Sequence, residues 1–430
     1  MVGAVLPPLQ IMNDLSPTPF TVLAAERRAN ASPRERGFYQ NPYAFYTALH
    51  AAGTPAFYWE DYRHWCFAGF KEVNALFRDK RFGREILHVT TREALGWPAP
   101  KPHLAAFNQT EKYSLLNLEP PDHTRLRMLV NRAFVSRHVE QLRPRIAALA
   151  NELIDQFEAD GQVELLKAFA APIPAIIIAE MIGVPRDMAM QLVAWSNTMV
   201  QMYMFGVSEA AEYAANAASV EFMDYLRRLI EERRRQPRED LLTHMLTADP
   251  VDGQRLTKDE VVSTAILLLN AGHEATVHTT GNAVKTILES GLDPKTLFAT
   301  PEQTAATVEE CLRFDAPLHM FTRYALQDVE LDGGIAVKQG EVIGLMLGAA
   351  NRDPVRFAHA DRFDPFRTDG ANVSFGAGIH FCIGAPLARI ELQEALSTLF
   401  RQLPGLRLAA EPHYNNVYHF HGLERLDVAW

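Results

Sequence analysis

The residue with the clearest chemical potential is Cys382, which lies in a loop rich in glycine. Gly376, Gly378 and Gly384 fall within nine residues around it. Three glycines at this spacing are typical of a tight loop whose backbone approaches another group closely. Pro386 then begins an amphipathic helix, so Cys382 lies just before a helix N-terminus, where the dipole and free N–H groups stabilise a thiolate. The loop therefore favours a ligating or reactive cysteine over a buried structural one.

A dinucleotide-binding turn is an alternative interpretation of the same loop. Gly376 and Gly378 begin a Gly-x-Gly-x-x-Gly pattern, but Phe381 stands where the third glycine is required. Because the pattern is incomplete, we discard this interpretation.

The segment from Phe375 to Gly384 resembles the haem-binding loop of the cytochrome P450 family, Phe-x-x-Gly-x-x-x-Cys-x-Gly, and matches every fixed position. The resemblance implies haem b (iron protoporphyrin IX) as cofactor, with Cys382 as the iron ligand whose thiolate favours O–O cleavage. It also implies cofactor-binding roles for Phe375 beside the macrocycle, for Gly376 and Gly384 in the loop, and for His380 at a haem propionate.

Further residues match the family's partners of the two haem propionates. His123 and Arg127 lie in a motif that starts at Pro121, and their spacing of four places both on one helix face. Arg323 lies on a predicted strand, where the family supplies another arginine. Together with His380, the resemblance implies four donors for two carboxylates that would otherwise be buried without partners.

Glu310 and Arg313 are three residues apart, a spacing that alone indicates only a helix ion pair. They resemble the family's Glu-x-x-Arg pair, and the segment from Asn351 to Arg367 resembles the one that closes on that pair before the cysteine loop. The resemblance implies a structural role for both residues, which fix the loop.

A histidine-rich segment of a predicted long helix suggests a zinc protease at first sight. His273, Glu274 and His278 approach the pattern His-Glu-x-x-His, but the second histidine is five residues away from the first. At about 100° per residue the two imidazoles point about 140° apart and cannot share one metal ion.

The same segment resembles the family's oxygen-binding groove. The resemblance implies that Gly272 leaves room for dioxygen, with a local opening of the helix, and that Glu274 relays protons. Ala275 replaces the family's usual threonine. Thr276 is adjacent but rotated about 100° on a regular helix. Water, a substrate hydroxyl, or Thr276 in a distorted helix then remain as alternatives for completing the relay.

Helical spacing dominates the chain and predicts a mainly helical protein with small β-sheets. The resemblance identifies this arrangement as the cytochrome P450 fold, and it implies that haem lies between the long central helix and the helix after the cysteine loop. Helical spacing predicts buried stripes and a central helix over 256–288, and Thr300 begins another helix with Gln303 completing a capping box. The stripes are Leu142, Ile146, Leu149, Leu153 and Phe157, and Met223, Leu226 and Ile230, with 231–235 as a solvated helix end. Alternating residues predict strands within 57–70 and 323–347.

Composition restricts the function further. The chain has 430 residues, a formal charge of -10 and only three cysteines, which argues against a nucleic-acid binder, a disulfide scaffold and an ordinary ferredoxin cluster. No signal peptide or membrane span is expected. We therefore expect one haem domain over 1–430, in a cytoplasmic protein that is a monomer.

The resemblance implies a monooxygenase that uses O2 and two electrons from a separate ferredoxin and ferredoxin reductase. The substrate is expected to be a medium-sized, largely apolar organic molecule, because the segments at the family's substrate positions are rich in methionine and phenylalanine: Met199, Met202, Met204, Phe205, Met320, Phe321 and Phe420. A peroxide-driven haem-thiolate oxidase and a non-catalytic haem protein, such as a gas sensor, are the alternatives.

Overall fold

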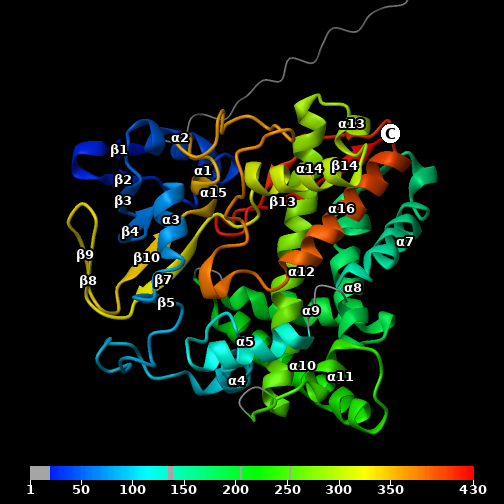
Figure 1. The fold of residues 1–430 in the computed structure, drawn as a ribbon, viewed down its shortest axis with the longest axis horizontal. Coiled ribbons are helices and arrows are strands. Elements are labelled where there is room, and N and C mark those ends of the chain that lie inside the picture. The colour runs from blue at the N-terminus through cyan, green and yellow to red at the C-terminus, as the bar shows by residue number, and fades with distance from the viewer. Residues whose placement is uncertain (1–19, 134–138, 204–205, 251–252) are drawn as a thin grey trace, which may run out of the picture.

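The computed structural model describes residues 20–133, 139–203, 206–250 and 253–430, and the prediction of a mainly α protein with small sheets is confirmed (Figure 1). Its helices are α1 (Arg36–Gln40), α2 (Tyr43–Ala51), α3 (Phe70–Leu76), α4 (Ala105–Glu111), α5 (Asp122–Ala133), α7 (Arg143–Ile154), α8 (Pro172–Ile182), α9 (Ala189–Val200), α10 (Glu209–Arg235), α11 (Leu241–Thr247), α12 (Lys258–Ser290), α13 (Pro294–Leu297), α14 (Pro301–Phe314), α15 (Leu347–Ala350) and α16 (Ala385–Gln402). Its strands are β1 (Thr21–Leu23), β2 (Arg28–Asn30), β3 (Ala56–Trp59), β4 (His64–Phe67), β5 (Phe82–Gly83), β6 (Gln162–Glu164), β7 (Phe321–Ala325), β8 (Val329–Leu331), β9 (Ile335–Val337), β10 (Val342–Leu345), β11 (Arg407–Leu408), β12 (His413–Tyr414), β13 (Leu423–Arg425) and β14 (Asp427–Ala429).

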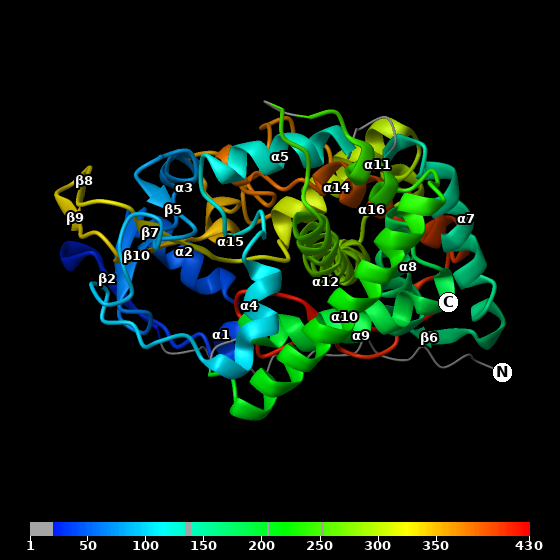
Figure 2. The ribbon, with the colours of Figure 1, turned by 90° about the horizontal axis from the view of Figure 1, so that it is seen from below.

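The central element is α12, which contacts α8, α9, α10, α14 and α16. Thr257 caps its N-terminus in a capping box with Glu260, and Gly291, at a φ of 70°, ends it in the left-handed conformation. Its apolar run over 261–269 is almost wholly buried. Figure 2 shows α12 near the middle of the molecule with α8 and α10 beside it. The prediction of a long helix over 256–288 is therefore confirmed with a shift of two residues at each end.

The two predicted strand clusters are confirmed. Their strands β3, β4, β7 and β10 join one sheet of order β1-β2-β3-β4-β10-β7-β5, whereas β8 and β9 of the second cluster form a separate two-stranded sheet. β10 runs parallel to β4 and antiparallel to β7, which places Ile343 beside Trp65 on one side and Arg323 on the other. β5 pairs with the outer edge of β7 and leads directly into Arg84. The sheet thus brings Arg84 and Arg323 together although 239 positions (323 minus 84) separate them in the chain.

The predicted helix stripes are largely confirmed. Ile146, Leu149 and Leu153 are buried on α7, and the stripe of α10 is buried as well. The prediction of a solvated end over 231–235 is wrong for Arg233, which is buried. Its guanidinium pairs with Asp240 and donates to a backbone carbonyl. The end of α10 therefore packs against the following segment, a tertiary contact that the helical spacing of apolar residues does not predict.

The start of α14 differs from the prediction in one contact. Thr300 accepts the backbone N–H of Gln303 as expected. The Gln303 side chain, however, donates to the Pro365 carbonyl at 3.3 Å and does not return to the cap. The capping box is therefore incomplete, because a tertiary hydrogen bond takes the amide.

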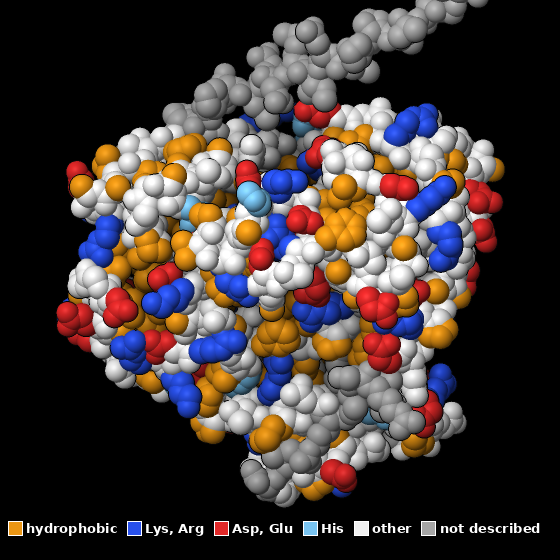
Figure 3. Space-filling view, turned by 45° about the horizontal axis from the view of Figure 1, so that its top comes forward, with side chains coloured by type: hydrophobic (Ala, Val, Ile, Leu, Met, Phe, Trp, Pro, Cys, Tyr) orange, Lys and Arg blue, Asp and Glu red, His pale blue; other side chains and the backbone are white. Residues whose placement is uncertain are grey.

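The surface in Figure 3 carries acidic and basic side chains interspersed over one face. Within the described ranges, no helix combines the length and the apolar character that crossing a bilayer requires.

Candidate active site

The cysteine loop has the tight geometry that its glycines predict. The Cys382 N–H donates to the Phe375 carbonyl at 3.0 Å and closes the loop. Gly378 has a φ of 71°, and a Cβ there would lie 2.3 Å from the Phe77 carbonyl oxygen, so only glycine fits. The cysteine of this loop is exposed, whereas the other two, Cys66 and Cys311, are buried. The loop therefore presents a single accessible thiol in front of α16.

Opposing effects act on the Cys382 thiol. Packing of the loop around the sulfur raises its pKa above the usual value for cysteine. Hydrogen bonds from the N–H groups of Gly384 and Ala385, and the charges of Arg127 and Arg389, act in the opposite direction. The N–H groups at the helix N-terminus thus favour the thiolate as the sequence predicts, but desolvation by the loop packed behind the exposed thiol has the larger effect on its pKa.

α5 contacts the cysteine loop directly through Arg127. Arg127 donates to the Phe381 carbonyl at 2.6 Å. From α16, the Arg389 guanidinium lies over the Phe375 ring, with its Cζ 4.5 Å from the centroid. The structure therefore brings Arg127, which the sequence assigned to the cofactor, to the immediate neighbourhood of Cys382.

His123 and His380 meet from two different segments, with ring centroids 4.5 Å apart. Burial, followed by the positive charge of His380 and Arg127, lowers the pKa of His123 to about 4. Its Nε2 is buried without a hydrogen-bond partner. His380 lies 3.3 Å from a carboxylate oxygen of Glu119, which also accepts the Arg84 backbone N–H at 2.5 Å. Sequence reasoning missed Glu119, which the structure places between His380 and Arg84.

Arg323 lies beside Arg84, a second residue that sequence reasoning missed. Burial, and then repulsion from Arg84, lowers the pKa of Arg323 to about 9. Burial also lowers the pKa of Arg84. Among the described residues, the Arg323 guanidinium donates only to the Thr322 carbonyl, at 2.9 Å. The buried Arg323, the half-buried Arg84, which donates to the carbonyls of Leu116 and Thr322, and the imidazole of His123 form a site that fits an anionic group such as a pair of carboxylates.

The accessible face of α12 lies on the side of the cysteine loop. Ala271 is exposed and Ala275 is half-buried, although the helix before them is buried. Leu267, one turn before Ala271, packs against the same small apolar cluster as Ile383, the neighbour of Cys382. The open part of α12 and the thiol therefore border the same region.

The oxygen-side motif has a regular backbone. The predicted local opening at Gly272 is wrong for this structure, because α12 is α-helical throughout. A Cβ on Gly272 would lie 2.7 Å from Cδ1 of Ile178 on α8, so this glycine also serves helix packing. The Thr276 hydroxyl donates to the Gly272 carbonyl at 3.0 Å, four residues back. Glu274 is half-buried, with Oε1 3.7 Å from Nε2 of His278.

The predicted structural pair forms a buried network. Arg313 donates to both oxygens of Glu310, at 2.7 and 2.8 Å. It also donates to the carbonyls of Asn351, Ala360 and Arg362 at 2.8–2.9 Å. Both side chains are 2 % exposed or less. The pair thus ties α14 to the segment that precedes the cysteine loop, as the resemblance implied.

The residues expected to line a substrate site have different surroundings. Met199 and Met320 are buried in hydrophobic clusters, and Met202 packs against one of them. Met204 and Phe205 lie outside the described residues. Phe420 forms a β-bridge with Leu318, so two distant loops meet there.

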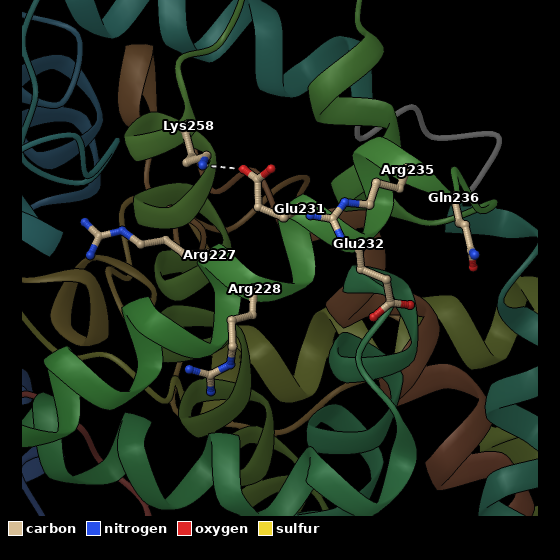
Figure 4. A pocket seen from close by; sticks show the side chains of 7 residues that line it. All are labelled: Arg227, Arg228, Glu231, Glu232, Arg235, Gln236 and Lys258. Carbon is tan, nitrogen blue, oxygen red and sulfur yellow. Dashed lines mark ion pairs between the residues drawn. The ribbon is translucent and has the colours of Figure 1, made fainter.

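A surface hollow of about 580 Å³ lies elsewhere, at the start of α12 (Figure 4). Its lining is charged, and Lys258 pairs with Glu231 across it; it includes Arg227, Arg228, Glu232 and Arg235. Lys258 precedes Gly272 by 14 residues, or about 21 Å of helix. This charged hollow is therefore separate from the thiol and unlike the apolar lining expected for the substrate.

We expect Arg323→Leu to accelerate the transfer of haem from this protein to apomyoglobin, because a haem propionate loses its buried cationic partner. The same variant should raise the melting temperature of haem-free protein, since one of two repelling guanidinium groups is removed. Arg401→Leu, on the exposed surface of α16, is the matched control. Unchanged haem loss in Arg323→Leu would contradict the assignment.

Comparisons with known proteins agree with this geometry. The family model "Cytochrome P450" matches residues 86–289 and 302–404. The chain is 35% identical over 396 residues to "Biotin biosynthesis cytochrome P450" of Bacillus subtilis, covering 91% of this chain and 97% of the relative. It is 35% identical over 396 residues to "Vitamin D(3) 25-hydroxylase" of Pseudonocardia autotrophica, covering 91% and 94%. The crystal structure of P450BioI in complex with hexadec-9Z-enoic acid ligated acyl carrier protein superposes with a TM-score of 0.83 at 35% identity, covering 91% of this chain and 99% of that one. The chain belongs to the cytochrome P450 family of monooxygenases.

Proposed function

We propose that this chain is a haem-thiolate monooxygenase that inserts one oxygen atom of O2 into a medium-sized, largely apolar organic molecule. The observation that carries the proposal is the accessible Cys382 thiol, which precedes a helix N-terminus and borders the open face of α12. Haem b, when bound, supplies the iron at which O2 is activated. One domain over 1–430 provides this centre.

The chain's residues have distinct roles in this proposal. Cys382 ligates the iron, with Phe375, Gly376 and Gly384 shaping its loop. His123, Arg127, Arg323 and His380 hold the propionates. Arg323 supports this role, because it is buried and, within the described part of the chain, forms no ion pair; Glu119 acts on its charge only at longer range.

Proton delivery is assigned to Glu274 on the accessible side of α12. Its carboxylate lies near His278 and is half-buried, so it reaches both solvent and the interior. Ala275 offers no hydroxyl, and the Thr276 hydroxyl is engaged by the Gly272 carbonyl. Water or a substrate hydroxyl therefore completes the relay.

Electrons are expected from a separate ferredoxin and its reductase. Candidates for a basic docking patch are four arginines in or near the segments of α5 and α16: Arg125, Arg132, Arg137 and Arg389. In the structure Arg125 pairs with Glu260 and Arg389 pairs with Glu309. The Arg132 side chain and all of Arg137 lie outside the described residues. Because these ion pairs neutralise Arg125 and Arg389, the surface is not purely basic. We therefore propose that a complementary arrangement of positive and negative charges docks the ferredoxin.

We infer the substrate class from the names of the relatives and from the apolar loops. Vitamin D(3) and hexadec-9Z-enoic acid, named for two relatives, are both largely apolar. Binding of the substrate should shift the haem from low to high spin, so a panel of apolar compounds screened by this shift identifies candidates. Turnover with ferredoxin, reductase, NAD(P)H and ¹⁸O₂ should place one labelled atom in the product. Equal turnover with hydrogen peroxide alone would favour the peroxide-driven alternative, and no product with any spin-shifting compound would favour a haem carrier.

We expect Glu274→Gln to lower turnover of a spin-shifting substrate by about 10²-fold or more, because an amide cannot carry the proton. Substrate binding and haem spectra should be unchanged. Ala275→Thr should change the fraction of NAD(P)H lost as peroxide. The measurement is product formed per NAD(P)H consumed.

Glu289→Gln is the matched control for this prediction. Glu289 lies near the end of the same helix and pairs with Lys285 at the surface. The Glu289→Gln variant should keep the turnover rate of the unmodified protein and its ratio of product formed to NAD(P)H consumed. Wild-type turnover in Glu274→Gln would remove this glutamate from the relay.

A further inference from the structure

A second cluster of metal-ligating side chains lies outside the candidate active site. Asp315 caps the end of α14, His319 follows it, and His421 comes from the C-terminal loop. They are 4%, 0% and 1% exposed, and one ligand atom from each lies within 4.8 Å of the others. Backbone hydrogen bonds hold the two loops together, from the His319 N–H to the carbonyl of His419 and from the His421 N–H to that of Pro317.

One tautomer of His319 leaves a ring nitrogen free to bind a metal ion. Nδ1 of His319 lies 2.7 Å from the Tyr46 hydroxyl oxygen, which lies 2.9 Å from the Tyr418 hydroxyl oxygen. When Nδ1 carries the proton and donates to Tyr46, Nε2 keeps its lone pair. The Tyr43 hydroxyl, 3.5 Å from Nε2, donates to Asp315 at 2.6 Å and has no second proton to offer.

His421 points an unpartnered nitrogen at the same carboxylate. Its Nε2 is buried without a hydrogen bond and lies 3.4 Å from Oδ1 of Asp315. Its ring is stacked on Tyr414 at 3.8 Å. A charged N–H···O hydrogen bond is shorter, about 2.7–2.9 Å. Two ligands about 2.0–2.1 Å from a tetrahedral zinc ion are about 3.3–3.4 Å apart, which is the separation observed.

The Asp315 carboxylate lacks a directly bonded arginine or lysine. It accepts hydrogen bonds from the hydroxyls of Tyr43 and Tyr414. Within the described residues, Arg352 and Lys285 lie over the rings of these tyrosines, 4.2 and 5.6 Å from the centroids, and neither donates to Asp315. The imidazole of His421, 3.4 Å away and without a hydrogen bond in the described part of the chain, is the remaining partner of this buried carboxylate, so a bound cation would complete its pairing.

We propose that Asp315, His319 and His421 bind a divalent transition-metal ion of the zinc class. Two imidazoles and one carboxylate are a donor set that suits Zn²⁺. The bond from His319 Nδ1–H to Tyr46 is the outer contact that such a histidine ligand commonly makes. Ligand atoms that lie up to 4.8 Å apart need to close by up to about 1.4 Å to reach the tetrahedral spacing of about 3.4 Å. The ion joins the end of α14 to the C-terminal loop, on both sides of the Leu318–Phe420 bridge.

The test is the zinc content of untagged, haem-loaded protein after dialysis against Zn²⁺ and then against metal-free buffer. Mass spectrometry should find about one zinc per haem iron in the unmodified chain. Asp315→Asn and His421→Gln should lose it. Tyr46→Phe, which removes the outer contact to His319 together with the hydrogen bond to Tyr418, should weaken zinc binding by about 10–100-fold. His413→Gln, at an exposed histidine of β12, is the control and should keep the zinc.

A second readout is the melting temperature, which Zn²⁺ should raise in the unmodified chain and in His413→Gln, with reversal by EDTA. Two results overturn the proposal: no retained zinc and no melting shift in the unmodified chain, which would leave a protonated His421 as the partner of Asp315, or equal zinc in Asp315→Asn and the unmodified chain. Neither readout depends on turnover, so failure here is distinguishable from failure of the proposed monooxygenase function.

Discussion

Cys382→Ser is expected to abolish the red-shifted Soret band of the reduced carbon monoxide complex and to reduce monooxygenase turnover to background. A thiolate is the electron-donating ligand that produces this band and favours O–O cleavage. The loop itself should survive, because its closing hydrogen bond to Phe375 uses the backbone N–H. The measurement is the reduced carbon monoxide difference spectrum at equal haem content.

Cys66→Ala is the control for this experiment. Cys66 is buried on β4 and outside the loop, so its loss should leave the band in place. A thiolate-type band in Cys382→Ser would assign the ligand to another cysteine.

Arg313→Leu is expected to prevent accumulation of folded, haem-loaded protein. The substitution leaves the Glu310 carboxylate buried with only Arg367 as an ionic partner, at 2.8 Å, and frees three backbone carbonyls. Breaking a buried ion pair by removing one partner costs about 3–5 kcal/mol. This is a large share of a typical unfolding free energy of about 5–15 kcal/mol. Thermal melting and haem content report the loss.

Arg186→Leu provides the comparison, because Arg186 pairs with Glu152 at the exposed surface. Exposed ion pairs contribute little, so its melting temperature should change only slightly. Equal melting temperatures for both variants would show that the Glu310 network does not support the fold.

The alternative explanations that the sequence raised are resolved by simple geometry. The zinc-protease pattern fails as the helix period predicts, because α12 is a regular α-helix over this segment and directs His273 and His278 about 140° apart. Burial lowers the pKa of His273 to about 4, which keeps that imidazole neutral. The predicted opening of α12 at Gly272 failed because Ile178 from α8 fills the space beside that glycine.

The sequence by itself determined the features that depend on neighbouring residues. The cysteine loop, the start of α16, the long central helix and the Glu310–Arg313 pair each follow from contiguous spacing, because backbone torsion, capping and helix period act over a few residues. The family assignment rests on the same local patterns.

Only the tertiary structure decided which distant residues share a site. Glu119 and Arg84 join the predicted cofactor residues because β5 pairs with β7, and Asp315, His319 and His421 meet because two loops bridge at Leu318 and Phe420. Arg233 is buried because a later segment supplies Asp240. No spacing rule predicts such contacts, since the packing of separate helices and strands brings together side chains more than 200 positions apart, such as Arg84 and Arg323, 239 positions apart, and Glu119 and His380, 261 positions apart.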